Sequence, residues 1–260
     1  MELRRAKIIS ITSSKGGIGK SIFLTNLAGI YETLGKKVLL VDLDLYNGVI
    51  STILNIHQDK TIYNFLEDLA NNRFVDAKDY LYKYSDYIDV LPTCKDQRQG
   101  NKISPRFVEK VIYSFINNYD VILIDNSHVP TPASLIAHDL SNIILYMISN
   151  DSLDIANSRE ILNIYNNLGR DNVRVILNNS FRAKEYFFSI KDISDVINRK
   201  IDFVIKDSLY IRNIDKYIMD GKILVLNKKI GFINSKDQKW FIDIANKLCE
   251  VVSDGEEKEQ

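Results

Sequence analysis

The 260-residue chain has little of what marks several classes of protein. It has only two cysteines, Cys94 and Cys249, which lie far apart, form no metal-ligand cluster and favour a reducing cytosol. Lysine and arginine together number 34, as do aspartate and glutamate, so the formal net charge is zero. This balance weakens a role in binding nucleic acid or anionic membranes, although it leaves room for a local basic patch.

Long apolar runs are also missing. No stretch approaches the roughly 20 apolar residues that cross a membrane. Arg4, Arg5 and Lys7 precede an apolar run that is too short for a signal peptide and is needed as a first strand. We therefore expect a cytoplasmic protein without direct membrane insertion.

What is present is a regular alternation of strand-like and helical patterns. The strand-like runs are rich in isoleucine, valine and leucine without polar alternation, as in strands buried on both faces. No linker, composition shift or internal repeat divides the chain. We therefore expect one domain over residues 1–252, an α/β fold with a doubly wound, mostly parallel twisted sheet and helices on both faces. Residues 253–260 are polar and acidic and are expected to form a disordered tail.

The individual elements follow from the periodicity of apolar residues and from capping signals. Strands are predicted at residues 8–11, 37–42, 88–92, 120–125, 142–149, 173–178 and 201–205. Helices are predicted near residues 22–34, 49–55, 61–70, 105–117, 152–169, 193–197, 208–219 and 236–252.

The most informative segment is the glycine-rich stretch 14–21, Ser-Lys-Gly-Gly-Ile-Gly-Lys-Ser. It lies between a strand and a helix, which is the context of a phosphate-binding loop (P-loop). Glycines let backbone N–H groups turn toward phosphate oxygens, and the helix N-terminus adds partial positive charge. We expect Lys20 to reach the β- and γ-phosphates and the Ser21 hydroxyl to coordinate Mg²⁺.

Ser14 occupies a position where the ordinary loop has glycine, and a second lysine, Lys15, follows it. The form Lys-Gly-Gly-x-Gly-Lys-Ser resembles the deviant Walker A motif of the MinD/ParA family of P-loop ATPases. The resemblance implies that Lys15 crosses a dimer interface to the partner's nucleotide and that ATP and Mg²⁺ are the ligands. The alternative is a glycine turn with two solvated lysines. The predicted nucleotide-binding residues here are Lys15, Gly16, Gly17, Ile18, Gly19, Lys20, Ser21 and Ile22.

Asp42 and Asp44 lie at the end of the second predicted strand. Ligands bind at this end of a parallel sheet, and residues at i and i+2 share one side of an extended chain. Near a nucleotide with Mg²⁺, one carboxylate could contact the metal shell and the other could orient a water. The pair resembles the Asp-x-Asp of the MinD/ParA family, which implies that Asp44 is catalytic, together with Lys15, and that Asp42 supports the metal. Strand-end caps are the alternative.

Asp125 ends a third hydrophobic strand, as in the Walker B pattern that holds Mg²⁺ directly or through water. With Ser21 and Asp42 it completes the predicted metal residues. The family usually continues with a small residue and then proline, where this chain has Asn-Ser-His-Val-Pro at residues 126–130. A surface or packing role is favoured for His128 in this segment.

Two polar residues farther along extend the resemblance. The segment 175–179, Val-Ile-Leu-Asn-Asn, resembles the family's strand whose terminal asparagine contacts adenine, which implies this role for Asn178. Asp207 falls where the family often has Ile-Pro-x-Asp, although the proline is missing here. Ordinary loop polarity is an equal interpretation of Asp207.

The last predicted helix carries an apolar stripe that allows two interpretations. An amphipathic membrane anchor would usually be rich in lysine and arginine, whereas this chain ends in acidic residues. The stripe is therefore expected to face the core. Its members are Trp240, Phe241, Ile244, Leu248, Val251 and Val252.

Residues 42–48, Asp-Leu-Asp-Leu-Tyr-Asn-Gly, resemble the Asp-Leu-Asp-Leu-x-x-Gly of the CpaE/TadZ branch, which localises pilus-assembly machinery. The resemblance implies a homodimer that forms with ATP, binds a pilus-assembly or other positioned protein complex, and releases it on slow hydrolysis. Such partners would recruit it to a cell pole or a membrane complex.

Other functions stay open. An ATP-binding scaffold with little hydrolysis would fit the altered segment after Asp125. A ParA-type DNA-partitioning ATPase is a second alternative, but the zero net charge and the lack of Asp-Pro-Gln-Gly argue against it. An iron–sulfur reductase of the same superfamily would need a cysteine soon after Asp125, and the sequence has none there.

Overall fold

The structure is a computed structural model that describes residues 5–100, 104–180, 187–209, 211, 214–227 and 235–250. Its strands are β1 (Lys7–Ser13), β2 (Val38–Asp42), β3 (Tyr82–Lys83), β4 (Ile88–Leu91), β5 (Val121–Asp125), β6 (Ile143–Ser149), β7 (Val173–Asn178) and β8 (Phe203–Ile205). Its α-helices are α1 (Lys20–Thr33), α2 (Ile50–Ile53), α3 (Ile62–Ala70), α4 (Gln97–Gly100), α5 (Val108–Tyr113), α6 (Pro132–Leu140), α7 (Ser152–Asn167), α8 (Ile190–Ile197), α9 (Ile214–Ile218) and α10 (Ser235–Glu250). Short 3-10 helices are η1 (Ala77–Tyr80), η2 (Pro105–Phe107), η3 (Asp207–Leu209) and η4 (Leu224–Leu226).

The strands form one eight-stranded sheet in the order β3-β4-β2-β5-β1-β6-β7-β8. All neighbouring strands run parallel except the short edge strand β3, which is antiparallel to β4. The central strands are buried along their whole length, as expected of apolar runs covered on both sides. The predicted fold class is thus confirmed.

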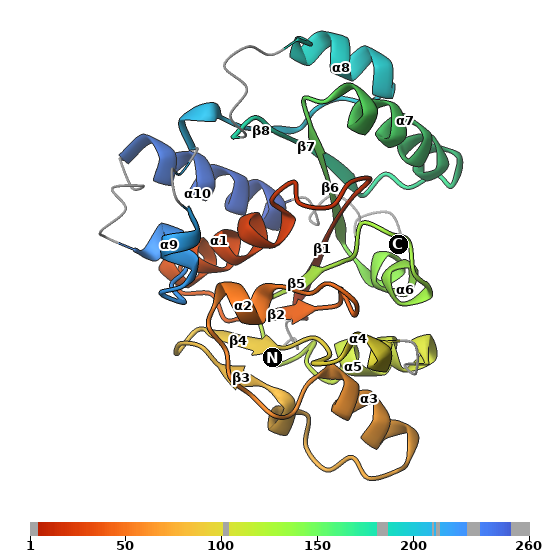
Figure 1. Ribbon diagram of the computed structural model, residues 1–260, viewed down its shortest axis with the longest axis vertical. Helices are drawn as coiled ribbons and strands as arrows, with labels where there is room; N and C mark the ends of the chain where they lie inside the picture. Colours follow the sequence, from red (N-terminus) through yellow and green to blue (C-terminus); the bar gives the residue numbers. More distant parts are fainter. Residues whose placement is uncertain are drawn as a thin grey trace, which may run out of the picture.

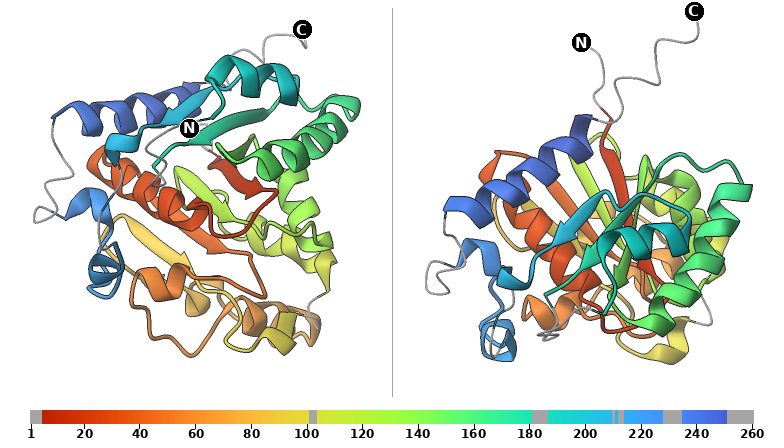
Figure 2. Two further views of the ribbon diagram at one scale, coloured as in Figure 1. Left: turned by 45° about the horizontal axis from the view of Figure 1, so that its top comes forward. Right: turned by 90° about the horizontal axis from the view of Figure 1, so that it is seen from above.

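Helices cover both faces of this sheet (Figures 1 and 2). On one face, α1 and α10 pack against alternate residues of the central strands, among them Ile9, Leu40 and Leu123. On the other face, α3, α5 and α6 cover β2 and β5, while α7 and α8 cover β6 and β7. The carboxyl ends of β1, β2 and β5 meet because the register pairs Asp125 with both Ile11 and Asp42.

The structure differs from the predicted elements in a few places. Helix α6 was not expected, although Thr131 caps it and Pro132 occupies its first turn, both common start signals. The predicted helix at residues 105–117 is shorter and divides into η2 and α5, and the one at 208–219 divides into η3 and α9. Short helices carry too little periodicity to be bounded from sequence.

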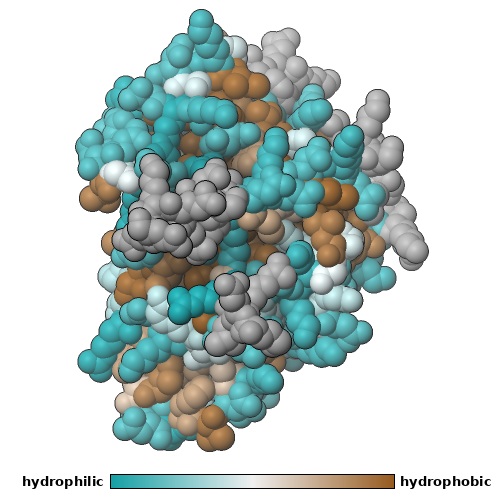
Figure 3. Space-filling view, turned by 180° about the vertical axis from the view of Figure 1, so that it is seen from behind, coloured by the Kyte–Doolittle hydropathy of each residue, from teal (hydrophilic) through white to brown (hydrophobic). Residues whose placement is uncertain are grey.

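The apolar stripe of the last helix faces the core. Phe241, Ile244 and Leu248 of α10 are buried in the cluster that α1 shares, as predicted. Val251, Val252 and the acidic tail at residues 253–260 lie outside the described residues. Within the described ranges, no helix is both long and apolar enough to cross a membrane. On the face seen in Figure 3, hydrophobic residues lie between hydrophilic ones, as on ordinary protein surfaces.

Candidate nucleotide-binding site

The loop between β1 and α1 has a backbone that requires glycine. Gly17 and Gly19 have φ angles of +74° and +97°, in the left-handed region that other residues rarely adopt. A Cβ atom at Gly19 would also lie 3.0 Å from Nδ2 of Asn178. Gly19 is the N-cap of α1, so the loop leads directly into a helix N-terminus. This is the strand–turn–helix arrangement in which backbone N–H groups can surround a phosphate.

A cavity of about 670 Å³ opens over this loop. Lys20 lies in its wall and is only 8% exposed, and burial lowers the pKa of its ammonium. Asp125, Asp44 and Asp154 oppose this shift. A buried cation in the wall of a cavity favours an anionic ligand there. Most of the lining is contributed by Gly16, Gly17, Gly19, Lys20, Ser21, Ile22, Asp44, Asn47, Val49, Thr52, Ile53 and His128.

Ser21 and Asp125 meet beside this cavity. The Ser21 hydroxyl donates a hydrogen bond to Oδ2 of Asp125, whereas Oδ1 of Asp125 is buried and finds no hydrogen-bond partner among the described residues. A hydroxyl and an unpaired carboxylate oxygen are hard donors of the kind Mg²⁺ prefers. No group of three or more histidine, cysteine or acidic residues in the described segments could hold a metal, so phosphate and water would supply the other ligands. These residues fit a Mg²⁺-nucleotide.

Asp44 and Asp42 have different surroundings. Asp44 lines the cavity, and its Oδ1 accepts hydrogen bonds from the Asn47 and Tyr46 amides at 3.0 and 3.4 Å. Asp42 is fully buried, is not among the residues lining the cavity, and accepts a hydrogen bond from the Ile50 amide at 3.1 Å. Burial, and then Asp125, raise the pKa of Asp42 well above its usual value.

A second, mostly apolar cavity of about 290 Å³ shares Gly17 and Gly19 with the first. Asn178 lies in its wall and is held in place: Nδ2 donates to the Ile18 carbonyl at 2.8 Å, and Oδ1 accepts from the Ser180 amide at 2.9 Å. An apolar pocket beside a glycine-rich loop of this kind suits a nucleobase. The other lining residues are Ile22, Phe23, Asn26, Ser180, Ile205, Leu209, Ile211, Ile214, Leu224 and Phe241.

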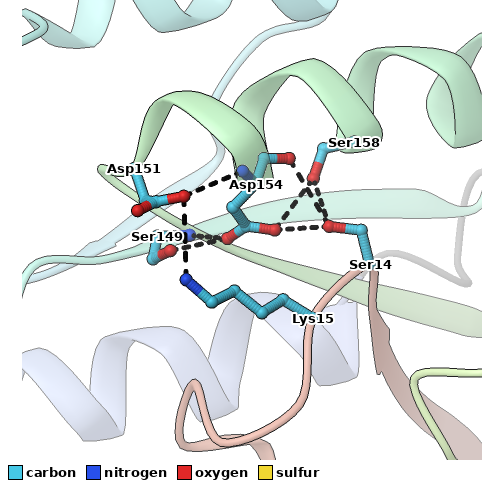
Figure 4. Close-up of polar contacts among 6 residues, drawn as sticks. All are labelled: Ser14, Lys15, Ser149, Asp151, Asp154 and Ser158. Carbon is cyan, nitrogen blue, oxygen red and sulfur yellow. Dashed lines mark hydrogen bonds and ion pairs between the residues drawn. The ribbon is translucent and has the colours of Figure 1, made fainter.

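Three further predicted residues lie outside these walls. Ile18 is 3% exposed and packs in the core, and its backbone carbonyl accepts the hydrogen bond from Asn178. Asp207 is exposed in η3 and is not among the residues lining the apolar cavity, although Leu209 of the same turn is. Lys15 is half-exposed and lines neither cavity; its Nζ lies 3.6 Å from Oδ1 of Asp151 (Figure 4).

From the sequence, a surface or packing role is favoured for His128. In the structure it lies in the wall of the cavity of about 670 Å³ over the glycine-rich loop, which we call the phosphate cavity. Its ring covers Gly16, where a Cβ would lie 3.4 Å from Cε1 and Nδ1. The segment that contains His128 is held over the glycine-rich loop because the Thr12 hydroxyl donates a hydrogen bond to the Ser127 carbonyl at 3.3 Å. Its position soon after Asp125 was the only sequence signal for this placement.

The comparisons with known proteins agree with this geometry. A family model described as "AAA domain" (AAA_31) matches residues 6–156. The chain belongs to the MinD/ParA family of P-loop ATPases. An uncharacterized ATP-binding protein of Methanocaldococcus jannaschii is 30% identical over 119 residues, which are 45% of this chain and 43% of that protein. The septum site-determining protein MinD of Thermotoga maritima is 24% identical over 208 residues, 77% of this chain and 75% of that protein.

Solved structures of this family share the fold. A ParA family ATPase from Chlorobium tepidum has a TM-score of 0.77 at 17% identity, covering 94% of this chain and 99% of that chain. MinD from Pyrococcus horikoshii, complexed with Mg-ADP, has a TM-score of 0.73 at 22% identity, covering 95% of this chain and 98% of that chain. The architecture is therefore that of a P-loop ATPase.

The buried Asp125 should make the ligand-free protein pH-sensitive. Burial raises the pKa of Asp125 from 3.8 to about 6, so the folded state binds this proton more tightly than the unfolded state. We expect stability to fall as the pH rises from about 4 to about 6. The loss is on the order of 3 kcal/mol, at about 1.4 kcal/mol per pKa unit.

Asp125→Asn should remove this part of the pH dependence and stabilise the ligand-free protein at pH 7. Denaturant unfolding between pH 4 and pH 8 measures the free energy of unfolding of both proteins, and Asp195→Asn on the exposed face of α8 is the control. An unchanged pH profile in Asp125→Asn would contradict the expectation.

Proposed function

We propose that this protein is an ATP-dependent dimerising switch that positions a protein complex. The observation that carries the proposal is the convergence of Lys20, Ser21 and Asp44 on one cavity, with Asp125 behind Ser21. The family and the Mg-ADP in the P. horikoshii MinD structure support a Mg²⁺-nucleotide as the ligand. Lys15 is half-exposed and does not line the phosphate cavity of its own subunit, which supports a contact between Lys15 and a second copy.

The residues of the site have different roles in hydrolysis. Lys20 binds the terminal phosphates and, in this buried position, is only weakly screened by water. Ser21 and Asp125 would hold Mg²⁺, which would neutralise charge on the phosphates. Asp44 stays fixed by the Asn47 and Tyr46 amides and orients the attacking water. Asp42 acts behind this site: its carboxylate holds the Ile50 amide and packs against Gly48.

Asp44→Ala should reduce turnover far more than nucleotide binding, because Asp44 orients water whereas Lys20 binds phosphate. We expect turnover to fall about 100-fold or more and ATP affinity to stay within a few-fold. Phosphate release and titration with a fluorescent ATP analogue measure the two quantities, with the exposed Asp195→Ala as control. Loss of binding with unchanged turnover per bound site would refute this role.

The positioned complex is the finer part of the proposal, and we favour pilus-assembly machinery of the CpaE/TadZ kind. Gly48 is the last residue of the Asp-Leu-Asp-Leu-x-x-Gly motif at residues 42–48. A larger residue would clash at this position, since a Cβ there would lie 2.5 Å from an oxygen of Asp42. Relatives include the antiactivator FleN of Pseudomonas aeruginosa, 21% identical over 204 residues, and MinD solved with MinC. The location of the tagged protein, compared with that of Lys20→Ala, separates a polar pilus complex from a septum or a nucleoid.

An ATP-binding scaffold with little hydrolysis is the alternative that a specific observation favours. His128 covers Gly16 at the wall of the phosphate cavity, in the segment where the family usually has proline. A turnover that is undetectable in the wild type while ATP still binds would favour the scaffold. ParA-type DNA partitioning remains less favoured at zero net charge.

A further inference from the structure

Two successive loop residues, Ser14 and Lys15, are attached to the first turn of α7, far away in sequence (Figure 4). The Ser14 hydroxyl donates a hydrogen bond to Oδ1 of Asp154, 140 residues away. The ammonium of Lys15 lies 3.6 Å from Oδ1 of Asp151. The start of the phosphate loop is therefore tied to one helix by two contacts of different kinds.

The contact of Ser14 is partly buried and does not stand alone. Asp154 is fully buried, and its second oxygen accepts hydrogen bonds from the Ser149 amide at 2.7 Å and the Ser149 hydroxyl at 2.6 Å. The Ser158 hydroxyl lies 3.2 Å from that of Ser14. Breaking such a network would leave a buried carboxylate short of partners, which is costly. Ser14 is thus a fixed anchor of the loop.

The contact of Lys15 is exposed and easily broken. The two side chains are 50% and 44% exposed, and exposed ion pairs contribute little to stability. Asp151 does not depend on Lys15 for its position, because its Oδ1 accepts the Asp154 amide at 3.0 Å and so caps α7. Lys15 can therefore leave Asp151 without disturbing the helix or the anchor.

We propose that Asp151 restrains Lys15 on its own subunit until the terminal phosphate of a nucleotide on a second copy displaces the carboxylate. This inference rests on the proposed function. The ammonium of Lys15 carries a single positive charge, so the two anions compete for it, and a terminal phosphate offers more charge and more acceptor oxygens than one carboxylate. The ion pair thereby opposes dimerisation in the absence of a terminal phosphate. Asp154 keeps the loop in place while Lys15 changes partner.

Asp151→Asn tests this restraint. Asparagine is as good an N-cap as aspartate, so α7 keeps its cap while the charge is lost. In the presence of a nonhydrolysable ATP analogue, we expect the variant to dimerise at a protein concentration roughly two- to fivefold lower than the wild type. Light scattering over a dilution series measures this. Asp151→Ser, which also keeps a capping oxygen, should behave in the same way.

The structure offers a matched control in Lys60 and Asp79, a pair that is also 3.6 Å apart and 51% and 52% exposed. Asp79→Asn removes the same charge from the surface and should leave dimerisation unchanged. Equal or weaker dimerisation of folded Asp151→Asn, while the wild type dimerises, would overturn the restraint and leave the proposed function intact. If wild type, Asp151→Asn and Asp151→Ser all stay monomeric, the proposed function fails as well. If Asp151→Asn and Asp151→Ser dimerise while the wild type stays monomeric, the restraint is stronger than expected.

Discussion

Lys20→Ala should weaken the binding of a fluorescent ATP analogue by roughly 10- to 150-fold, the equivalent of about 1.5–3 kcal/mol for charge-assisted contacts. Lys20 is the buried cation in the wall of the phosphate cavity, and the shortened side chain would leave the terminal phosphates without it. Fluorescence titration with Mg²⁺ present measures the effect.

Lys200→Ala is a suitable control, since this lysine is exposed and lines neither cavity. A thermal unfolding curve shows whether Lys20→Ala is folded, and removal of a buried charge should not by itself unfold the protein. Equal affinities of Lys20→Ala and wild type would exclude ATP binding through this loop.

Lys15→Ala should abolish dimerisation while ATP binding persists. A phosphate loop needs one lysine for its own nucleotide, and Lys20 occupies that place, whereas Lys15 lies outside the cavity. In a symmetric dimer two Lys15 contacts of about 1.5–3 kcal/mol each would be lost, which corresponds to a 100-fold or larger change in the dimer dissociation constant. Light scattering should show a wild-type dimer with ATP but not with ADP.

Lys60→Ala, at an equally exposed lysine, should dimerise like the wild type. Two results would count against the switch. One is a wild type that stays monomeric in a saturating nonhydrolysable analogue. The other is a Lys15→Ala variant that dimerises as well as the wild type, which would leave Lys15 as a surface residue.

Sequence and structure agree best where one physical signal dominates. The strand ending at Asp125 and the strand ending at Asn178 lie where their apolar runs predicted, because continuous apolar runs have few alternatives to a buried strand. Helix α6 was missed because its nine residues carry only a weak periodicity between two strands. The short edge strand β3 has two residues, too few for any pattern.

The candidate site also has parts that the sequence predicts and parts that only the structure shows. Its loop could be found from sequence since the glycines and Lys20 are consecutive in the chain. The roles of Asp42 and Asp44 could not be separated in that way, since both lie at one strand end, yet the structure buries Asp42 beneath Gly48 and turns Asp44 to the cavity. The side-chain directions depend on the turn that follows the strand.

The sequence by itself determined the glycine-rich loop between strand and helix, the parallel α/β fold and the acidic residues at the strand ends. These depend on local pattern: glycine where φ is positive, apolar runs where strands are buried, and carboxylates at strand termini. Only the tertiary structure decided that His128 covers Gly16 and that Ser14 and Lys15 are tied to Asp154 and Asp151. Such contacts join segments more than 100 residues apart, and no local pattern specifies them. They arise because β1 lies between β5 and β6 in the sheet, which brings the segments after all three strands to one edge.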